Sequence, residues 1–559
     1  MAIILLLNNQ GSNYPIRFLS QNLLMNIRNY PFLAALFLFF LQFLCITAIS
    51  AQNFSYSNNS TTTKYWVFFS QKDTTNYDYL TAISAKTIEN RTLQNLPLWQ
   101  YSDISVSENF VKEIENSVTE KSIVKSKWLN AISIYLNEEE AQRVQNLPFV
   151  THLQALTTKW QPLSYAETLT KESAKEMGKA MEQLELSVFQ KEKLTGKGVV
   201  IGVIDAGFYG CDKSNYLKHL DKSRVLGMRD FVNPKQKDLF REKETSDDSH
   251  GKTVLEMIGG YDKESTDAKQ VGTASEAQFY LARTDHGVNE TRSEEDFWVA
   301  AMEWMDSAGV KLINTSLGYS VGFDDKDDNY DISQMDGKTS VVSKAVNMAF
   351  NEKGILIVVS AGNEGWDNWK IVSTPGDSPF ALSIGATNGS GLKMGYSSIG
   401  ADFVDFLKPN VACYSLTGTS FSAPNITGFA ACLWQKNPKA TNKEIFETIE
   451  KSATLYPFGN NFIGYGIPKA SNAIKILEGE TIQPTIKKVE EKGDTFKFDL
   501  AAGQRYLVFH KQDKRIVVEQ DSEKAASKSK IKITVKRPKD ANFSTIYIDD
   551  IGGFEVEWK

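Results

Sequence analysis

The sequence predicts an α/β fold in which helices cover both faces of a parallel sheet, preceded by a small α+β segment and followed by a small antiparallel β segment. Residues 199–204 and 354–361 are short apolar runs of the kind that form buried parallel strands. Helical patterns alternate with such runs through the middle of the chain, as a parallel sheet requires. After residue 479 the pattern changes to short segments of alternating polarity, which predict the closing β segment.

Composition excludes some classes of partner. The chain has 559 residues, a net charge of −6 and no basic tract, so nothing in it indicates a nucleic-acid partner. Its four cysteines are Cys45, Cys211, Cys413 and Cys432. Cys45 lies in a segment that is expected to be removed, and the remaining three are too few and too odd in number for a disulfide framework. Their disulfide state stays open.

The first 51 residues have the pattern of an export signal. Arg28 precedes the apolar run 32–46, and small residues close the segment at Ala51. This order predicts a secretory signal peptide over residues 1–51, and therefore a secreted or cell-surface protein with no stable membrane insertion after its removal. A translation start at Met25 would leave a signal of ordinary length. A membrane anchor is the alternative, because the apolar run is long.

Residues 52–175 predict a small α+β domain and part of a linker. The expected strands are 65–70, one or two within 123–136, and 149–155, and the expected helix is 137–146. The expected order, strand, helix, strands, helix, strand, is that of a split β-α-β unit, and an unrelated adaptor domain is the alternative. Residues 159–192 are polar and rich in lysine, so we expect an exposed linker that a protease can reach.

Residues 176–479 form the predicted α/β domain. Further strands are expected at 277–282 and 311–314, and helices at 250–260, 296–308, 340–351 and 425–434. The helix at 296–308 is expected to stop at Gly309. Its expected buried face consists of Phe297, Ala300, Ala301, Trp304, Met305 and Ala308. Thr441 and Glu444 form a capping box that opens the last expected helix of this domain.

Residues 480–559 predict a small antiparallel β domain. Its expected strands are 495–499, 505–510, 515–519, 530–535 and 544–549. The strand with Tyr506 and Phe509 needs an apolar partner surface, which the α/β domain could supply. The role of the domain stays open between a substrate-binding accessory, a surface-attachment or export signal, and a packing extension.

Ser420 stands in an environment suited to a nucleophile. It lies in a Gly-Thr-Ser motif that begins at Gly418, directly before the apolar helix expected at 425–434. The unpaired N–H groups and the positive dipole end of a helix favour an oxyanion formed beside such a serine. An ordinary N-cap serine on a core helix is the alternative.

A serine nucleophile needs a base to take its proton and an acid to orient that base. Of the five histidines, only His250 opens an apolar helix-like run. Asp205 ends the buried strand 199–204, so its carboxylate is expected at the carboxyl edge of the sheet, where open α/β sheets bind ligands. Asn363 follows the strand 354–361 and places an amide at the same edge. Such an amide can donate to the oxyanion that develops during acyl transfer.

The ordered set of Asp205-Ala-Gly, His250-Gly, Ser-Ala-Gly-Asn363-Glu-Gly and Gly-Thr-Ser420-Phe-Ser-Ala-Pro resembles the subtilisin-like serine proteases, or subtilases, of the peptidase S8 family. The resemblance covers residues 194–477, and the order Asp, His, Asn, Ser is that of the family. It implies a subtilisin-like fold and a serine endopeptidase with an Asp-His-Ser triad and an Asn oxyanion donor. A catalytically silent subtilase fold used for binding or at the cell surface is the alternative.

The resemblance also implies how the protein is made and what it binds. Residues 52–175 would be a propeptide that inhibits the enzyme intramolecularly and is removed by self-cleavage, and the partners would be protein or peptide substrates. The implied substrate-binding residues are Ser316, Leu317, Gly318 and Gly362. No cofactor is expected to be required. Calcium is implied by the family alone, and no metal ligand is assigned, because the acidic loop 323–331 lacks the regular spacing of a calcium loop.

Three departures from the family pattern stand out. Ala206 follows the aspartate where the family more often has Ser or Thr, and Lys252 stands where it has Thr, but neither position supplies an atom for the chemistry. The segment 408–418 is shorter than usual, so the pocket wall formed there, and with it the substrate preference, stays open.

Overall fold

The computed structural model describes residues 62–75, 77–156, 178–221, 223–241, 247–263, 270–285, 294–320, 330–526 and 530–559. The predicted signal peptide, most of the acidic loop and residues 159–177 of the predicted linker lie outside this set. Residues 62–559 belong to one unit of the chain. Within the described part, no helix combines the length and apolar character needed to cross a membrane.

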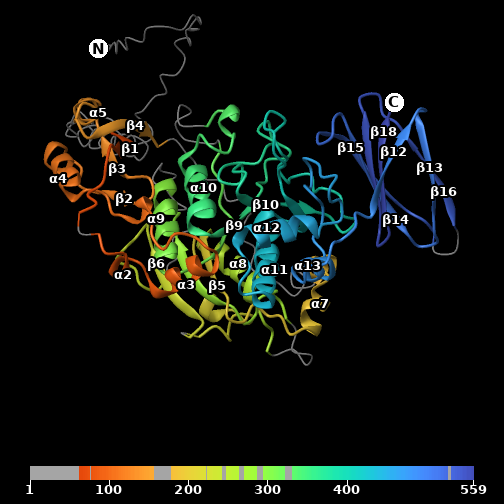
Figure 1. Cartoon of the computed structure of the whole chain (residues 1–559), viewed down its shortest axis with the longest axis horizontal. Coiled ribbons are helices and arrows are strands. Elements are labelled where there is room, and N and C mark those ends of the chain that lie inside the picture. Colours follow the sequence, from red (N-terminus) through yellow and green to blue (C-terminus); the bar gives the residue numbers. More distant parts are fainter. Residues whose placement is uncertain are drawn as a thin grey trace, which may run out of the picture. The chain divides into compact units, whose positions relative to one another are not determined.

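A seven-stranded parallel sheet forms the centre of this unit (Figure 1). Its strands are β5 (Val200–Asp205), β6 (Val225–Asp230), β7 (Gln278–Arg283), β8 (Leu312–Thr315), β9 (Leu356–Ser360), β10 (Ala381–Thr387) and β11 (Val411–Tyr414). Their order is β11-β10-β9-β8-β5-β7-β6, so β6 and β7 lie on one side of β5, and β8 to β11 follow one another on its other side. In sheets with such a reversal of strand order, ligands usually bind at the carboxyl ends of the strands where the order reverses, here β5 and β8. The sequence predicted β5, β7, β8 and β9 but not β6, β10 and β11.

Helices cover both faces of the sheet, as expected. The helices are α7 (Leu186–Lys191), α8 (His250–Gly259), α11 (Ala423–Lys436), α12 (Asn442–Lys451) and α13 (Ala470–Leu477) on one face, and α9 (Glu294–Ser307) and α10 (Val341–Lys353) on the other. Successive strand residues point to opposite faces. In β9, for example, Ile357 packs in the cluster of α9 and α10, and its neighbour Val358 packs in the cluster of α8 and α11.

Three expectations for this region were wrong. The capping box of Thr441 and Glu444 opens α12, but α13 follows it, so α12 is not the last helix. Residues 178–192 are not an exposed linker, because Leu184 and Phe189 are buried in the core and the Phe189 ring lies 4.9 Å from that of Phe429. The third concerns the buried face of α9.

The helix α9 buries more of its surface than its apolar stripe predicts. Its fully buried apolar residues are Trp298, Val299, Ala301, Met302 and Met305, whereas Phe297, Ala300, Trp304 and Ala308 are only partly buried. Its five acidic residues, Glu294, Glu295, Asp296, Glu303 and Asp306, are buried as well. The helix α9 is therefore covered by other elements on two sides. The periodicity of its apolar residues identified only part of the side that faces the sheet.

The N-terminal region covers the side of α9 that faces away from the parallel sheet. It contains a four-stranded antiparallel sheet in the order β2-β3-β1-β4. Its strands are β1 (Thr63–Phe69), β2 (Val124–Ser126), β3 (Ala131–Leu136) and β4 (Val150–Ala155), and its helices are α2 (Tyr79–Ala82), α3 (Ala85–Leu93), α4 (Glu108–Ser117) and α5 (Glu138–Gln145). Val67 faces α4 and α5, and Trp66 faces the cluster of α9. The predicted α+β order is present, but α2 and α3 were not foreseen.

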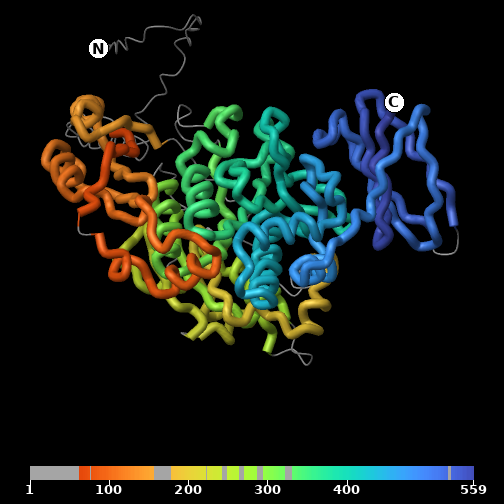
Figure 2. Tube along the Cα trace, in the orientation of Figure 1, coloured from red at the N-terminus to blue at the C-terminus, as the bar shows by residue number. Residues whose placement is uncertain are grey.

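The C-terminal region contains a five-stranded sheet in the order β12-β18-β17-β14-β15 and a two-stranded sheet of β13 and β16. Its strands are β12 (Ile486–Glu491), β13 (Thr495–Leu500), β14 (Arg505–Lys511), β15 (Val517–Lys524), β16 (Ile531–Lys536), β17 (Phe543–Ile548) and β18 (Gly552–Trp558). The β structure is antiparallel as expected, except that β12 and β18 pair in parallel. The sequence did not predict β12 and β18. Figure 2 follows the chain through the three regions, from red to blue.

Candidate active site

Asp205 and His250 are joined by a short hydrogen bond at the carboxyl edge of the sheet. Asp205 is the last residue of β5 and His250 is the first residue of α8. The His250 Nδ1 lies 2.6 Å from Asp205 Oδ1, and neither side chain is exposed to solvent. Because a carboxylate only accepts, Nδ1 carries the proton in this pair. The second ring nitrogen, Nε2, is then the one that can act as a base.

Close backbone packing brings the two loops of this pair together. A Cβ on Gly251 would lie 2.5 Å from the carbonyl oxygen of Gly207 and 2.9 Å from Asp205 Cβ. A Cβ on Gly207 would lie 2.6 Å from the backbone of Asp248. Side chains at these positions would push the loops apart, so the glycines that follow Asp205 and His250 are needed for the 2.6 Å contact.

Arg283 ties the same two loops to the end of β7. Its Nε donates to the Ala206 carbonyl at 3.1 Å, and its two terminal nitrogens lie 3.2 Å from Asp230 and 3.2 Å from Asp248. All these groups are buried. The sequence did not predict this support. It shows only a charged residue, Arg283, directly after the expected strand 277–282, which does not reveal the partners of that residue.

Ser420 is the central residue of a 3-10 turn formed by Thr419–Phe421. The helix α11 begins only at Ala423, so the expected helix N-terminus at Ser420 is corrected to this turn. The serine is buried. Its Oγ lies 3.5 Å from the Ser316 carbonyl oxygen, and Ser316 Oγ donates back to the Ser420 carbonyl at 3.2 Å. This exchange couples the turn to the segment that follows β8.

Asn363 is oriented by Thr419, the neighbour of Ser420. The Thr419 N–H and Oγ1 both donate to Asn363 Oδ1, at 2.9 and 3.1 Å. Since a backbone N–H can only donate, it fixes the oxygen of the amide toward Thr419. The Nδ2 group then points elsewhere with its two donors. The Gly362 N–H in turn donates to Thr419 Oγ1 at 3.1 Å.

The residues expected to bind substrate follow β8 and β9. The structure brings Ser316 to Ser420 and Gly362 to Thr419. Leu317 is buried in the apolar cluster of α9, and Gly318 is buried beside it. Their role in substrate binding stays a prediction.

The cysteines of the α/β domain are buried, and a buried thiol is unreactive. Cys211, Cys413 and Cys432 are free and buried, and burial raises the pKa of the Cys413 and Cys432 thiols well above the usual range. Among the described residues, no group of three or more His, Cys, Asp or Glu side chains could hold a metal ion. The expectation that no cofactor is required stays a prediction.

Comparison with known proteins relates both the α/β domain and the N-terminal region to one family. Residues 196–466 match the model described as Subtilase family, of peptidase S8, and residues 64–176 match the peptidase S8 propeptide domain of Bacteroidota. Subtilisin NAT of Bacillus subtilis subsp. natto is 26% identical over 347 residues, which cover 60% of this chain and 78% of that protein. Subtilisin of Bacillus pumilus is 27% identical over 291 residues, covering 50% of this chain and 92% of that protein.

A solved structure shares the fold. Fervidolysin of Fervidobacterium pennivorans, described as a keratinolytic enzyme related to subtilisin, superposes with a TM-score of 0.50 at 16% identity. The match covers 87% of this chain and 70% of that one.

Proposed function

Since the chain belongs to the subtilase family and is a serine-type peptidase, we propose that it is a secreted endopeptidase that hydrolyses peptide bonds with Asp205, His250 and Ser420. The observation that carries the assignment is the 2.6 Å hydrogen bond between His250 and Asp205. This bond leaves Nε2 of the histidine as the base, at the edge of the sheet that also carries Ser420.

In the proposed first step, Ser420 Oγ attacks the substrate carbonyl carbon while His250 Nε2 takes the hydroxyl proton. The carboxylate of Asp205 stabilises the imidazolium that forms. The negative charge that develops on the carbonyl oxygen is received by the Asn363 Nδ2 group and the Ser420 backbone N–H. Orientation of Asn363 by Thr419 supports this role, because the amide does not have to turn during the reaction.

In the proposed second step, His250 returns the proton to the leaving amine, and an acyl enzyme on Ser420 remains. Water then enters, loses a proton to His250 and attacks the ester, so the same groups act in reverse. The products are two peptides, and the enzyme returns to its starting protonation state.

The proposal includes synthesis as a zymogen that processes itself and is exported. The match of residues 64–176 to a peptidase propeptide supports a zymogen. The polar, lysine-rich composition of residues 159–177 supports cleavage there. The signal-peptide pattern of residues 1–51 supports export.

The test is active-site labelling of the processed protein with a fluorophosphonate, followed by peptide mapping. We expect one labelled residue, Ser420, and no label in Ser420→Ala. Hydrolysis of an unblocked peptide library by the same preparation would give the cleavage preference. A processed, folded protein that neither takes the label nor cleaves any peptide would support the silent binding fold instead.

A further inference from the structure

The side chain of Arg283 makes the next contact beyond the point where two strands of the sheet stop pairing. Asp205 and Arg283 are the last partners in the parallel pairing of β5 and β7. The residue after this pair, Ala206, is buried, so its carbonyl needs a partner within the protein. Arg283 Nε donates to this carbonyl at 3.1 Å and so holds residue 206 at the end of β7.

The orientation of the Asp205 carboxylate depends on residue 206. The Ala206 N–H donates to Asp205 Oδ1 at 2.9 Å, and His250 Nδ1 lies 2.6 Å from the same oxygen. Among the described residues, none donates to the second oxygen, Oδ2, although it is buried. Besides the histidine, the backbone N–H of residue 206 is therefore the group that orients this carboxylate. A displacement of residue 206 would turn the oxygen that His250 contacts.

The same guanidinium holds the segment that precedes His250. Its two terminal nitrogens lie 3.2 Å from Asp248, two residues before the histidine, and 3.2 Å from Asp230, the last residue of β6. Asp230 is itself fixed, because its Oδ1 accepts the backbone N–H groups of Val232 and Asn233 at 2.9 and 2.7 Å. A guanidinium is planar and its donors form a rigid fork. Its three partners therefore keep fixed positions relative to one another.

The contacts between the two loops are separate from this one. A Cβ on Gly207 would meet the backbone of Asp248, and the Tyr209 N–H donates to the Asp248 carbonyl at 2.7 Å. These contacts join the loop after Asp205 to the segment before His250. Arg283 joins both of them to the ends of β6 and β7.

We infer that Arg283 is a positioning residue for the proposed reaction, which sets the contact between Asp205 and His250 through Ala206 on one side and Asp248 on the other. In the proposed mechanism it touches neither the substrate nor a reacting atom. The positioning role rests on the proposed function for its kinetic effect alone, because the hydrogen bond between Asp205 and His250 can be measured in an inactive chain.

The first experiment measures this hydrogen bond by proton NMR in the full chain carrying Ser420→Ala. A proton in a short, charge-assisted bond between an imidazole and a carboxylate resonates far downfield of ordinary amide protons. The resonance is assigned by its loss in His250→Gln. Arg283→Met should shift it upfield or broaden it beyond detection, because donor and acceptor no longer hold their short distance. The result does not depend on catalysis.

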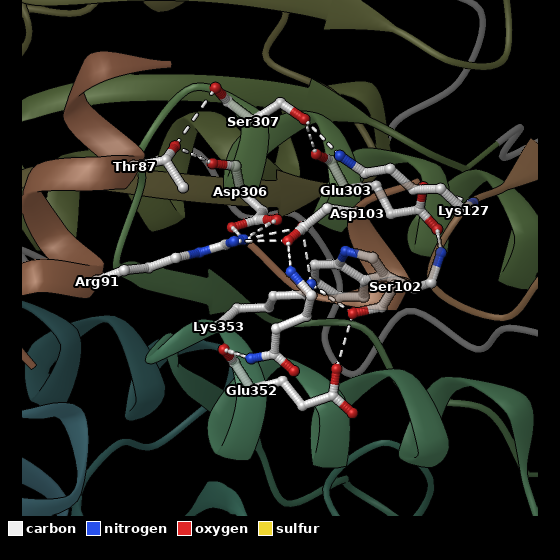
Figure 3. Close-up of polar contacts among 12 residues, drawn as sticks. Thr87, Arg91, Ser102, Asp103, Lys127, Glu303, Asp306, Ser307, Glu352 and Lys353 are labelled. Carbon is white, nitrogen blue, oxygen red and sulfur yellow. Dashed lines mark hydrogen bonds and ion pairs between the residues drawn. The ribbon is translucent and has the colours of Figure 1, made fainter. Parts of the chain in front are cut away.

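Arg91→Met is the matched control. Arg91 is also buried beside two aspartates, Asp103 at 2.6 Å and Asp306 at 3.3 Å, in the contact between the N-terminal region and α9 (Figure 3). Each substitution removes an arginine from two buried carboxylates, so both should lower the thermal midpoint. Only Arg283→Met should change the resonance.

Arg283→Lys serves if methionine at this position prevents folding. Lysine keeps the positive charge beside Asp230 and Asp248, but an ammonium group cannot reproduce the rigid fork that also reaches the Ala206 carbonyl. It should shift the resonance in the same direction as Arg283→Met, by a smaller amount.

The second experiment measures steady-state kinetics of the active, processed protein. Arg283→Met should lower kcat by about 10- to 100-fold with KM within about 3-fold, because a misplaced catalytic pair weakens the transition state more than substrate binding. Arg224→Met is the control at the opposite end of β6 and β7, where Arg224 donates to the Ala277 and Ser275 carbonyls at 2.8 and 2.6 Å. It should leave kcat within about 2-fold of the parent.

A folded Arg283→Met or Arg283→Lys protein with the resonance of the parent would overturn the inference. A lower thermal midpoint with unchanged kcat would overturn it too, and so would absence of the resonance from the parent. A resonance that changes in Arg283→Met and not in Arg91→Met supports the positioning role even if the active chain hydrolyses no peptide. That failure would reject the proposed function alone.

Discussion

Thr419 holds the amide oxygen of Asn363 through two hydrogen bonds of 2.9 and 3.1 Å. The bond from the backbone N–H persists whatever residue stands at 419, and the bond from Oγ1 does not. Substitution of Thr419 therefore tests the role of its side chain separately from the role of Asn363. In the proposed mechanism, Asn363 donates to the oxyanion and the Thr419 side chain positions Asn363.

Asn363→Ala should lower kcat by about 10²- to 10³-fold, the usual size for loss of one oxyanion donor. KM should change little, because the donor is needed for the transition state more than for the bound substrate. Steady-state kinetics on a short peptide measure both quantities. A rise in KM that accounts for the whole loss would make Asn363 a substrate-binding residue.

Thr419→Val should have a smaller effect, about 3- to 20-fold in kcat, because the backbone bond to Asn363 remains. In Asn363→Ala, the same valine substitution should add almost nothing, since the group that it positions is already gone. Kinetics of the double variant provide the check. Additive losses in the two variants would mean that Thr419 acts independently of Asn363.

Ser420→Ala should lower kcat by several orders of magnitude, and His250→Ala should cost about as much, because the triad acts as a unit. The double variant should be no worse than either single variant. These rates are measured against the uncatalysed reaction with high enzyme concentration. Near-normal turnover in either single variant would remove that residue from the triad.

The positions of the four proposed chemical residues in the fold could be predicted, because each lies where a local sequence pattern begins or ends. Asp205 ends an apolar strand and Asn363 follows one, whereas His250 opens an apolar helix and Ser420 precedes one. An apolar run and the residue that ends it can be recognised from a few consecutive residues of the sequence. Because the strands are parallel and their order reverses at β5 and β8, the carboxyl ends of these strands are expected to meet at one edge of the sheet.

The supporting contacts could not be predicted, because they join residues far apart in the chain. Arg91 meets Asp306 across 215 residues, and Arg283 meets Asp230 across 53. A charged residue has no periodic signal that reveals whether it is exposed or buried with a partner. The same limit explains α9, whose acidic residues are covered by a separate region that its own periodicity does not encode.

Self-cleavage should fall within residues 157–177. The sequence prediction extended the linker to 192, but Leu184 and Phe189 pack in the core, so that part is not free to enter the cleft. The Ser420→Ala protein should therefore accumulate with its N-terminal region attached. N-terminal sequencing of both proteins identifies the bond. Cleavage of the pure inactive variant at the same bond would exclude self-processing.

Lys408 should make stability depend on pH. Burial lowers the pKa of its ammonium from 10.5 to about 7, against the opposing effects of Glu450 and Asp377. Below pH 7 the lysine is protonated in both states, and the folded state bears the full cost of the buried charge. Between pH 7 and 10.5 the unfolded state binds more protons than the folded state, so this group raises the free energy of unfolding as the pH rises.

The measurement for Lys408 is the thermal midpoint of the Ser420→Ala protein with and without Lys408→Met, at pH 7 and pH 9.5. The parent should gain stability relative to Lys408→Met at the higher pH, and other ionisations cancel in the comparison. Lys443→Met is the control, because its side chain is 73% exposed. A difference between parent and Lys408→Met that stays constant over this range would contradict the lowered pKa.

The C-terminal β region should stabilise the catalytic region without taking part in catalysis. Alternate residues of β14 face opposite ways: Leu507 packs with Leu455 and Ile463 of the α/β domain, and Val508 packs inside the β region. Arg515 adds hydrogen bonds to the Phe406 and Val404 carbonyls at 2.9 and 2.7 Å. The apolar partner surface that the sequence required of this strand is therefore on the α/β domain.

Removal of residues 480–559 would expose this apolar surface, including Leu455 and Ile463, to water. Residues with proposed chemical roles all lie between Asp205 and Ser420, so kcat/KM on a short peptide should stay within about 3-fold while the thermal midpoint falls. Each Å² of apolar area exposed in this way costs about 25 cal/mol, so the truncation should lower the free energy of unfolding of the catalytic region.

Leu507→Ala and Val508→Ala distinguish the interface from the β region itself, because they remove similar side chains from neighbouring positions. Leu507→Ala should destabilise the catalytic region by about 2–4 kcal/mol, since it opens a cavity between the two regions. Val508→Ala should lower only the unfolding transition of the β region. Calorimetry of both variants in the Ser420→Ala background resolves the two transitions. Loss of peptide turnover in a truncated protein that melts like the full chain would instead show that the β region supplies part of the active site.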